Sequence, residues 1–268
     1  YMEITPVTEE VIVTIAGNHD SAVYDGTEHK VTGYKVTAIS NELYAESDFS
    51  FSGTAEAKRT EAGTTYMGLT AEDFANKSAN FSNVTFKVTD GYMEITPVTE
   101  EVVVTITGNH DSTVYDGEEH EVIGYDVAIS NPLYTEGDFT FSGTAEVAGT
   151  NADTYEMGLS ADDFTNTSGN FANVRFDVTD GFLKITKREV EFTANSASKA
   201  YDGKALTDDG YTLTGGSLAE NQKETVTVVG SQTLVGSSDN EITEVRIVAG
   251  GTVTRALGED VTDNYAIT

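Results

Sequence analysis

Apolar and polar residues alternate along several short segments of the chain, a pattern typical of β-strands with one buried face. Residues 84–88 read Val-Thr-Phe-Lys-Val, and residues 174–178 read Val-Arg-Phe-Asp-Val. The three apolar positions are the same in both segments, while the two positions between them change, in one case from a positive to a negative charge. We therefore predict that the constant apolar side chains face a core and that the variable ones face water.

Longer stretches of sequence also recur at a fixed interval. Residues 1–6 (Tyr-Met-Glu-Ile-Thr-Pro) return unchanged at 92–97, and residues 182–187 (Phe-Leu-Lys-Ile-Thr-Lys) are a weaker form of them. The two intervals are 91 and 90 residues. Self-similarity at a fixed spacing indicates a tandem array, and a repeat of about 90 residues is long enough to bury a core of its own.

A second recurring motif places an aromatic residue directly before Asp-Gly. Residues 23–26 and 114–117 read Val-Tyr-Asp-Gly, and residues 200–203 read Ala-Tyr-Asp-Gly. Glycine tolerates a positive φ, and an aspartate side chain bonds to the backbone close to it. The motif therefore predicts a ring in a core followed at once by a turn, three times along the chain.

One segment has the pattern of a helix N-terminus. Thr70 can accept a hydrogen bond from the amide of Asp73, whose side chain can reach back, and Leu69 and Phe74 are spaced to form a hydrophobic staple. The second repeat has the same arrangement at Leu159, Ser160, Asp163 and Phe164. Because asparagines follow within one or two turns, we predict only a short helix over residues 70–77.

These patterns predict an all-β protein of three tandem small β-modules, each an immunoglobulin-like sandwich. A β-grasp-like unit, with the 70–77 helix lying across one sheet, is the alternative. The expected boundaries are 1–5 (the terminal strand of a preceding module), 6–96 (module 1), 97–186 (module 2) and 187–268 (module 3). No Gly/Ser linker separates the modules, so we expect a stiff rod about 100–120 Å long.

Module 3 diverges most from the other two. Strong strands are expected at residues 224–229 and 244–248, but the sequence stops before any equivalent of 182–185. We therefore expect module 3 to lack its closing strand and to expose an unpaired edge. Residues 1–5 of a neighbouring molecule could fill that edge by strand addition. We take the chain to be a fragment of a larger protein.

The composition narrows the possible functions. The 268 residues carry a formal net charge of −30 and include no cysteine. A surface this acidic repels the phosphates of nucleic acids and anionic membranes, so we expect neither as a partner. The lack of cysteine excludes disulfides, thiolate catalysis and cysteine-based zinc sites. No apolar run is long enough to cross a membrane.

The sequence contains none of the catalytic motifs that we sought: a phosphate-binding glycine loop with lysine, His-Glu-x-x-His, or Gly-x-Ser-x-Gly. Scattered carboxylates do not define the facing pair that a glycosidase needs. We therefore expect no enzyme activity, no catalytic residue and no cofactor. The expected partners are neighbouring repeats of the same chain, together with an unidentified host glycan or protein if the chain binds one.

Histidines are the best candidates for metal ligands. His19 and His29 are ten residues apart and could face each other across a turn, with Asp20 or Glu28 adding an oxygen ligand. The second repeat has His110 and His120 at the same positions, and module 3 has no counterpart. A pair of histidines near a hairpin is more often simply polar surface, so we assign no metal site.

The sequence also contains candidate ligands for calcium. Asp73, Asn76 and Asn80 could supply oxygen ligands, but they lack the spacing of an EF-hand loop. Helix caps and turns that use Asx side chains explain these residues more simply. No calcium site is therefore predicted.

The order of the motifs resembles a known family. Val-Thr-Ile-x-Gly, Val-Tyr-Asp-Gly, Asn-Phe/Tyr and Gly-Tyr/Phe-x-x-Ile-Thr-Pro/Lys follow one another as they do in the YDG/MBG-type repeats of large bacterial surface proteins. The resemblance is strongest at residues 10–26, 101–117 and 187–203. It implies extracellular β-rich modules, attached to a bacterial cell wall, that form a stalk projecting a distal domain. The alternative that it leaves open is an adhesive module for a host glycan or protein.

Overall fold

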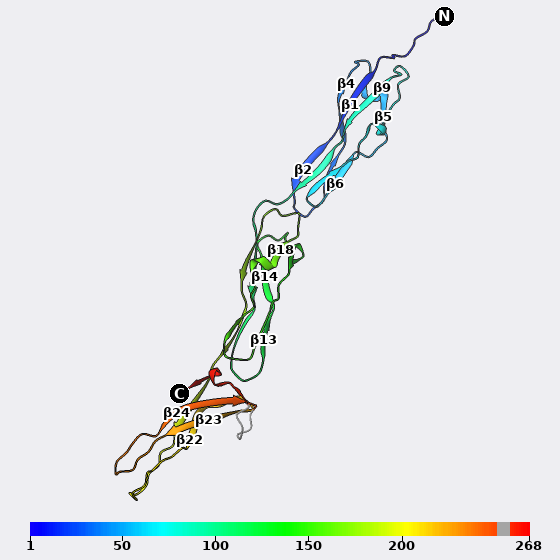
Figure 1. Cartoon of the computed structure of the whole chain (residues 1–268). Helices are drawn as coiled ribbons and strands as arrows, with labels where there is room; N and C mark the ends of the chain where they lie inside the picture. Colours follow the sequence, from blue (N-terminus) through cyan, green and yellow to red (C-terminus); the bar gives the residue numbers. More distant parts are fainter. Residues whose placement is uncertain (251–257) are drawn as a thin grey trace. The chain divides into compact units, whose positions relative to one another are not determined.

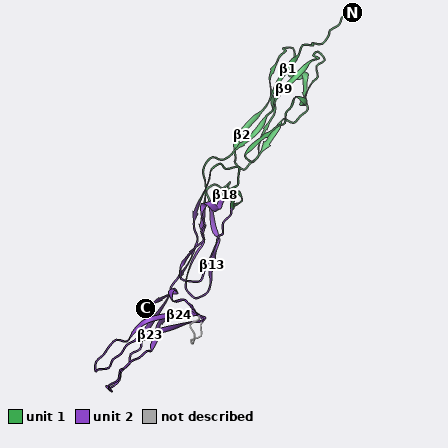
Figure 2. Cartoon of the chain, in the orientation of Figure 1, with its two compact units in different colours: residues 1–104, 129–140, 165–176 green, residues 105–128, 141–164, 177–268 purple. Residues whose placement is uncertain are grey.

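The computed structural model describes residues 1–250 and 258–268, and these residues form an all-β protein (Figure 1). They make up two compact units, each coloured separately in Figure 2. Unit 1 comprises residues 1–104, 129–140 and 165–176, and unit 2 comprises residues 105–128, 141–164 and 177–268. Among the described residues, no helix is long and apolar enough to cross a membrane.

The first sheet of module 1 contributes one face of that module's core. Its strands run in the order β4 (Tyr34–Ile39), β1 (Val11–Gly17), β9 (Val84–Thr89), with β1 antiparallel to β4 and parallel to β9. Alternate residues of β1 are completely buried, and the apolar side chains of β9 pack against them. This confirms the inward face predicted from the alternation in residues 84–88.

The second sheet of module 1 is built around the repeated Tyr-Met-Glu-Ile-Thr segment. Strand β10 (Tyr92–Thr96) lies in its centre, parallel to β2 (His19–Val23) and antiparallel to β7 (Gly63–Tyr66). Met93 and Ile95 of β10 are each only 1% exposed. Two further antiparallel pairs complete the sandwich: β3 (His29–Thr32) with β6 (Glu56–Arg59), and β5 (Phe49–Phe51) with β8 (Phe74–Asn76).

Module 2 repeats this arrangement. Its sheets run in the orders β14-β11-β19 and β12-β20-β17, with the pairs β13-β16 and β15-β18. The strands are β11 (Val102–Gly108), β12 (His110–Val114), β13 (His120–Ile123), β14 (Tyr125–Ile129), β15 (Phe139–Phe141), β16 (Glu146–Gly149), β17 (Thr154–Glu156), β18 (Phe164–Asn166), β19 (Val174–Thr179) and β20 (Phe182–Thr186).

Module 3 keeps the first sheet and differs in the rest. Strand β21 (Arg188–Ala194) lies between an antiparallel β22 (Tyr211–Gly216) and a parallel β26 (Tyr265–Ile267). The second sheet has the order β23-β24-β25, and its strands are β23 (Gln222–Val229), β24 (Glu241–Ala249) and β25 (Glu259–Asp260). Residues 195–210 contain no strand, apart from one isolated bridge between Leu206 and Gln232.

The helix expected at residues 70–77 is shorter than predicted. It is one 3-10 turn, Ala71–Asp73, followed directly by strand β8. The Thr70 amide donates to Asp73 Oδ2 at 2.7 Å, as expected, but the Thr70 hydroxyl donates to the same oxygen instead of accepting from the Asp73 amide. No α-helix occurs in residues 1–250 or 258–268, so the structure is a sandwich and lacks the helix that a β-grasp unit needs.

Candidate module interface

The three Asp-Gly motifs fold into the same turn. The aspartate Oδ1 accepts a hydrogen bond at 2.9 Å from the amide two residues later in each of the three cases, Asp25, Asp116 and Asp202. The following glycines have φ values between 76° and 86°, a region that residues with a Cβ rarely adopt. The predicted turn chemistry is therefore confirmed in all three modules.

The tyrosines before these turns have different surroundings. Tyr115 is 1% exposed, Tyr24 is half-buried, and Tyr201 is 66% exposed. The difference follows from what covers each ring. Tyr24 and Tyr115 both pack against the next module along the chain, whereas no ring contact is recorded for Tyr201 in the described part of the chain.

The first interface joins modules 1 and 2. The Tyr24 ring meets the edge of the Phe171 ring, with a centroid separation of 5.6 Å and an interplanar angle of 77°. The turn glycine, Gly26, lies beside Leu133. A Cβ atom added to this glycine would be 3.4 Å from Leu133 Cδ2, which is van der Waals contact. Leu133 is 38% exposed, whereas its module 1 counterpart, Leu43, is 79% exposed. The turn therefore covers an apolar part of module 2.

An asparagine next to that phenylalanine provides the polar contacts of the first interface. The Ala62 amide of module 1 donates to Asn170 Oδ1 at 2.7 Å. The Asn170 side-chain amide in turn donates to the carboxylate of Glu61. The asparagine thus bonds to module 1 through both ends of its side chain.

The second interface joins modules 2 and 3 through the same kinds of residue. Tyr115 meets the edge of Tyr265 at a centroid separation of 5.5 Å and an angle of 78°. The Ala152 amide donates to Asn264 Oδ1 at 2.6 Å, and Asn264 Nδ2 donates to Asn151 Oδ1 at 2.9 Å. Asn264 is 5% exposed and is the one buried polar side chain identified in the described residues. Both interfaces therefore use an asparagine followed by an aromatic residue.

A chain of hydrogen bonds is found at the second interface. The Ala219 amide donates to the Tyr265 hydroxyl, which donates to Gln222 Oε1 at 2.6 Å. Gln222 Nε2 then donates to the Tyr115 hydroxyl at 2.7 Å. Buried polar groups are tolerated when each finds a partner, and this chain satisfies both tyrosine hydroxyls.

Hydrogen bonds in the turns and burial at the second interface shift the pKa values of several side chains. The hydroxyl and amide of Thr27, with a further contribution from His29, lower the pKa of Asp25 to about 2. The Glu118 amide and His120 also lower the pKa of Asp116. Burial raises the pKa of Tyr265.

The histidines considered as metal ligands have other contacts. The His19 ring stacks on Tyr92 at 5.2 Å, and His29 Nε2 lies 3.0 Å from Asp25 Oδ1. In module 2 His110 stacks on Phe182 in the same way. Its other histidine, His120, contacts Asp116 at 3.0 Å, as His29 contacts Asp25. Within the described residues, no group of three or more His, Asp or Glu side chains is placed to hold a metal ion.

Two of the three candidate calcium ligands, Asp73 and Asn76, make hydrogen bonds within their own turns and loops, and the third is Asn80. Asp73 caps the 3-10 turn, and the Asn76 side chain accepts from the Ser78 amide and from the Tyr44 hydroxyl. Asn80 is exposed in the middle of the loop between β8 and β9.

The interface residues do not form a recognisable group in the sequence. Asn170 and Asn264 belong to the recurring Asn-Phe/Tyr motif, whereas no repeated motif contains Gln222. The recurrence of that pair at one place in each repeat was the available signal. The motif does not reveal that its aromatic ring meets the tyrosine before the Asp-Gly turn of the preceding module, or that its asparagine bonds to another loop of that module.

The fold and these interfaces define the class of protein: a tandem array of small β-sandwich modules that contact one another through their turns. The MBG domain family model matches residues 102–187, about a third of the chain, which correspond to module 2. MBG domains are non-catalytic repeat-type modules, in general terms those of surface proteins. A search of curated proteins found no match to the chain.

Proposed function

We propose that the chain is a non-enzymatic stalk or spacer segment of a bacterial cell-surface adhesin, in which tandem β-modules project a distal domain. The observation that carries this proposal is the repeated interface. At both junctions an asparagine side chain bonds to a loop amide of the preceding module, and an aromatic ring meets the tyrosine of its turn. Such contacts restrict rotation between neighbouring modules, as a spacer requires.

Small-angle X-ray scattering from the full chain tests this proposal. A stalk should give a maximum dimension of about 100–120 Å, as expected for three compact units of about 90 residues end to end. The double variant Asn170→Ala and Asn264→Ala should broaden the distribution of distances, because it removes the asparagine contacts at both junctions. A profile typical of one compact globule, unchanged in the double variant, would contradict the proposal.

The alternative is an adhesive module that binds a host glycan, and one cluster of rings favours it. His19, Tyr92 and Tyr66 form a row on the second sheet of module 1, with centroid separations of 5.2 and 5.9 Å. Tyr66 is 64% exposed. Exposed aromatic rings are surfaces on which sugars stack.

A glycan-array screen distinguishes the two functions. Binding that is lost in Tyr66→Ala and kept in Tyr201→Ala would support the adhesive module. Module 2 has Glu156 at the position paired with the Phe182 ring, where module 1 pairs Tyr66 with Tyr92. Any such site is therefore specific to module 1, and an array without hits favours the spacer.

A further inference from the structure

Two long segments of module 1 run side by side in the same direction. Residues 11–16 of β1 pair in parallel with residues 84–89 of β9, and residues 19–23 (β2) pair in parallel with residues 92–96 (β10). In both ladders each residue lies opposite the one 73 positions later. The segments 11–23 and 84–96 therefore form one parallel ribbon, although its two halves belong to different sheets.

Glycines keep this ribbon continuous where it passes from the first sheet to the second. A Cβ atom added to Gly17 would overlap the Gly91 nitrogen, and one added to Gly91 would overlap the Asn18 carbonyl oxygen. Glycine at both positions lets the two backbones touch. The Tyr92 amide then donates to the Asn18 carbonyl at 3.2 Å, which begins the second half of the ribbon.

Module 2 has the same ribbon. The Val102 amide, at the start of β11, donates to the Asn173 carbonyl at 2.9 Å, and β12 pairs in parallel with β20. A Cβ atom added to Gly108 would overlap the nitrogen of Gly181, as in module 1. The close approach of two glycine backbones is therefore repeated at the same place.

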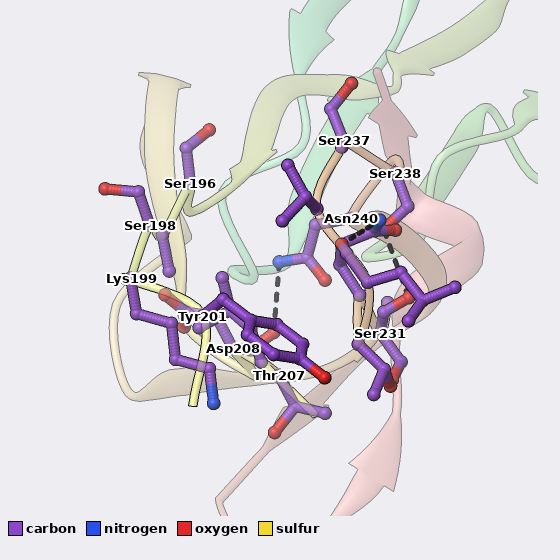
Figure 3. A pocket seen from close by; sticks show the side chains of 18 of the residues that line it. Ser196, Ser198, Lys199, Tyr201, Thr207, Asp208, Ser231, Ser237, Ser238 and Asn240 are labelled. Atoms are coloured by element: carbon purple, nitrogen blue, oxygen red, sulfur yellow. Dashed lines mark hydrogen bonds between the residues drawn. The ribbon is translucent and has the colours of Figure 1, made fainter. Parts of the chain in front are cut away.

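Module 3 has a different structure at the corresponding place. Asn195 follows β21 as Asn18 follows β1, and residues 196–200 come next. These residues form no strand and line a cavity of about 680 Å³, at which Figure 3 shows Ser196, Ser198 and Lys199. Among residues 1–250 and 258–268, both halves of the ribbon occur in modules 1 and 2.

Tension along the chain loads the ribbon in one particular direction. Because modules 1 and 3 flank module 2 in the sequence, a pull reaches module 2 at the start of β11 and leaves it at the end of β20. The equivalent strands of module 1 are β1 and β10. Such a pull draws two parallel segments in opposite directions along their common axis, so the ladder hydrogen bonds are strained together. A pull on adjacent ends of an antiparallel pair would break them one after another.

The strands that receive the pull are also the hardest to remove. Strand β1 lies between β4 and β9, and β10 lies between β2 and β7, so detaching either one breaks two ladders. Their apolar side chains are buried: Ile15 is 0% exposed and Met93 is 1% exposed. Sliding β1 or β10 along the ribbon therefore also disrupts the core.

A threonine adds a bond at the end of the ribbon where the chain leaves each module. The Thr96 hydroxyl donates to the Ala22 carbonyl at 3.2 Å, and the Thr186 hydroxyl donates to the Thr113 carbonyl at 3.0 Å. Both bonds join the two segments of the ribbon, so both are loaded by the same pull.

We propose that modules 1 and 2 are mechanical clamps, which carry tension along the chain through shear of the parallel ribbon. The proposal rests on the spacer function, since a spacer is under tension whenever its distal domain is held. It adds a property that length and stiffness alone do not require: resistance to unfolding in the direction of the chain.

Single-molecule force spectroscopy of the full chain tests the clamp, because handles can be attached to introduced cysteines in a chain that has none. Handles at Glu9→Cys and Thr99→Cys load the ribbon of module 1 in shear. Handles at Glu9→Cys and Glu42→Cys pull instead on one end of the antiparallel β1/β4 pair, beside the bond from the Ser40 amide to the Ile12 carbonyl. Module 1 should yield in this peeling geometry at less than about half the shear force. Equal forces in the two geometries would overturn the proposal.

Two threonine variants test which bonds carry the load. Thr96→Val removes the hydroxyl bond within the ribbon, and Thr37→Val removes a bond of equal length, 3.2 Å, from β4 to the Thr14 carbonyl of β1. Valine suits a strand, so both variants should fold. Thr96→Val should unfold about fivefold faster under shear, the effect of one hydrogen bond, and should peel at an unchanged force. Thr37→Val should show the opposite pattern. Equal acceleration by both variants under shear would contradict a load carried by the ribbon.

The clamp and the spacer can fail separately. A chain that is extended by X-ray scattering but yields at the same force in both geometries would keep the spacer and overturn the clamp. A chain that scatters as one compact globule would contradict the spacer itself. Extended scattering together with a higher force in shear than in peeling would support both.

Discussion

The two module interfaces are built from the same motif but differ in how deeply they are buried. At the first, Tyr24 is half-buried, and its hydroxyl has no hydrogen-bond partner among residues 1–250 and 258–268. At the second, Tyr115 is 1% exposed and its hydroxyl accepts from Gln222. Buried residues of both modules belong there to one apolar cluster, which contains Leu183 and Ile185 as well as Phe192. The same turn can therefore form either a partly exposed contact or a shared apolar core, depending on the module that follows it.

Truncating the turn tyrosines should give the largest difference between the interfaces. Tyr115→Ala removes a fully buried ring and should destabilise module 2 by about 3–5 kcal/mol. Tyr24→Ala removes a half-buried ring and should cost about 1–2 kcal/mol. Urea unfolding followed by module-specific NMR signals measures both, because a multi-module chain does not unfold as one unit.

The third tyrosine is the matched control for this series. Tyr201 precedes the same turn but is 66% exposed, so Tyr201→Ala should change stability by less than about 0.5 kcal/mol. Equal losses in Tyr24→Ala and Tyr115→Ala would show that depth of burial does not distinguish the interfaces.

Replacing the interface asparagines by alanine should give the next largest difference in stability between the two interfaces. Asn264→Ala removes a side chain that is 5% exposed and that accepts from the Ala152 amide, and should cost about 1–3 kcal/mol. Asn170→Ala removes the corresponding bond to Ala62 at a half-exposed site, where water can replace it, so the loss should be smaller. Hydrogen exchange of the two alanine amides reports on this directly. We expect the Ala62 amide in Asn170→Ala to exchange faster than the Ala152 amide in Asn264→Ala. Slower exchange at Ala62 would contradict the difference in solvent access between the two interfaces.

Gln222 offers a test of the hydrogen-bond chain alone. Gln222→Met keeps a similar volume but leaves the hydroxyls of Tyr115 and Tyr265 without the glutamine contacts. The expected loss is about 1–2 kcal/mol for groups buried without a partner. Gln232→Met in the same module is the control, because that side chain donates to a nearby loop carbonyl, that of Leu234, and takes no part in the hydrogen-bond chain. If both variants unfold at the same urea concentration, the hydrogen-bond chain adds nothing to the second interface.

Local sequence was sufficient to predict the elements within each module. The alternation in 84–88 gave the buried face of β9, and the Asp-Gly motif gave a turn with a positive φ. The helix at 70–77 was overestimated because Phe74 continues as strand β8, where pairing with β5 outweighs the local cap. Tertiary pairing of this kind is not visible in a short window of sequence.

The interfaces were harder to predict for a different reason. Asn264 contacts residues more than 110 positions earlier in the chain, so no local pattern links them. The three tyrosine rings were expected in a core. Tyr115 lies in one, although that core belongs to two modules, whereas Tyr201 is 66% exposed and the prediction is wrong for it. Residues 1–6 and 92–97 show the same limit, since one sequence is a buried strand in one place and unpaired in the other.

The smallest expected difference lies in the acid titration of the two turns. The Thr27 hydroxyl is the first cause of the low pKa of Asp25, about 2, and module 2 has Glu118 at that position. Because the pKa is lower in the folded turn than in the unfolded chain, the turn is stabilised above about pH 4 and loses this stabilisation as the pH falls towards 2. Thr27→Ala removes the hydroxyl donor and should raise the pKa of Asp25, while the Thr27→Ser variant keeps the donor and should leave it unchanged. NMR titration of the Asp25 carboxyl carbon measures the shift, and identical curves for the alanine and serine variants would assign the low pKa to the backbone amide and His29 instead.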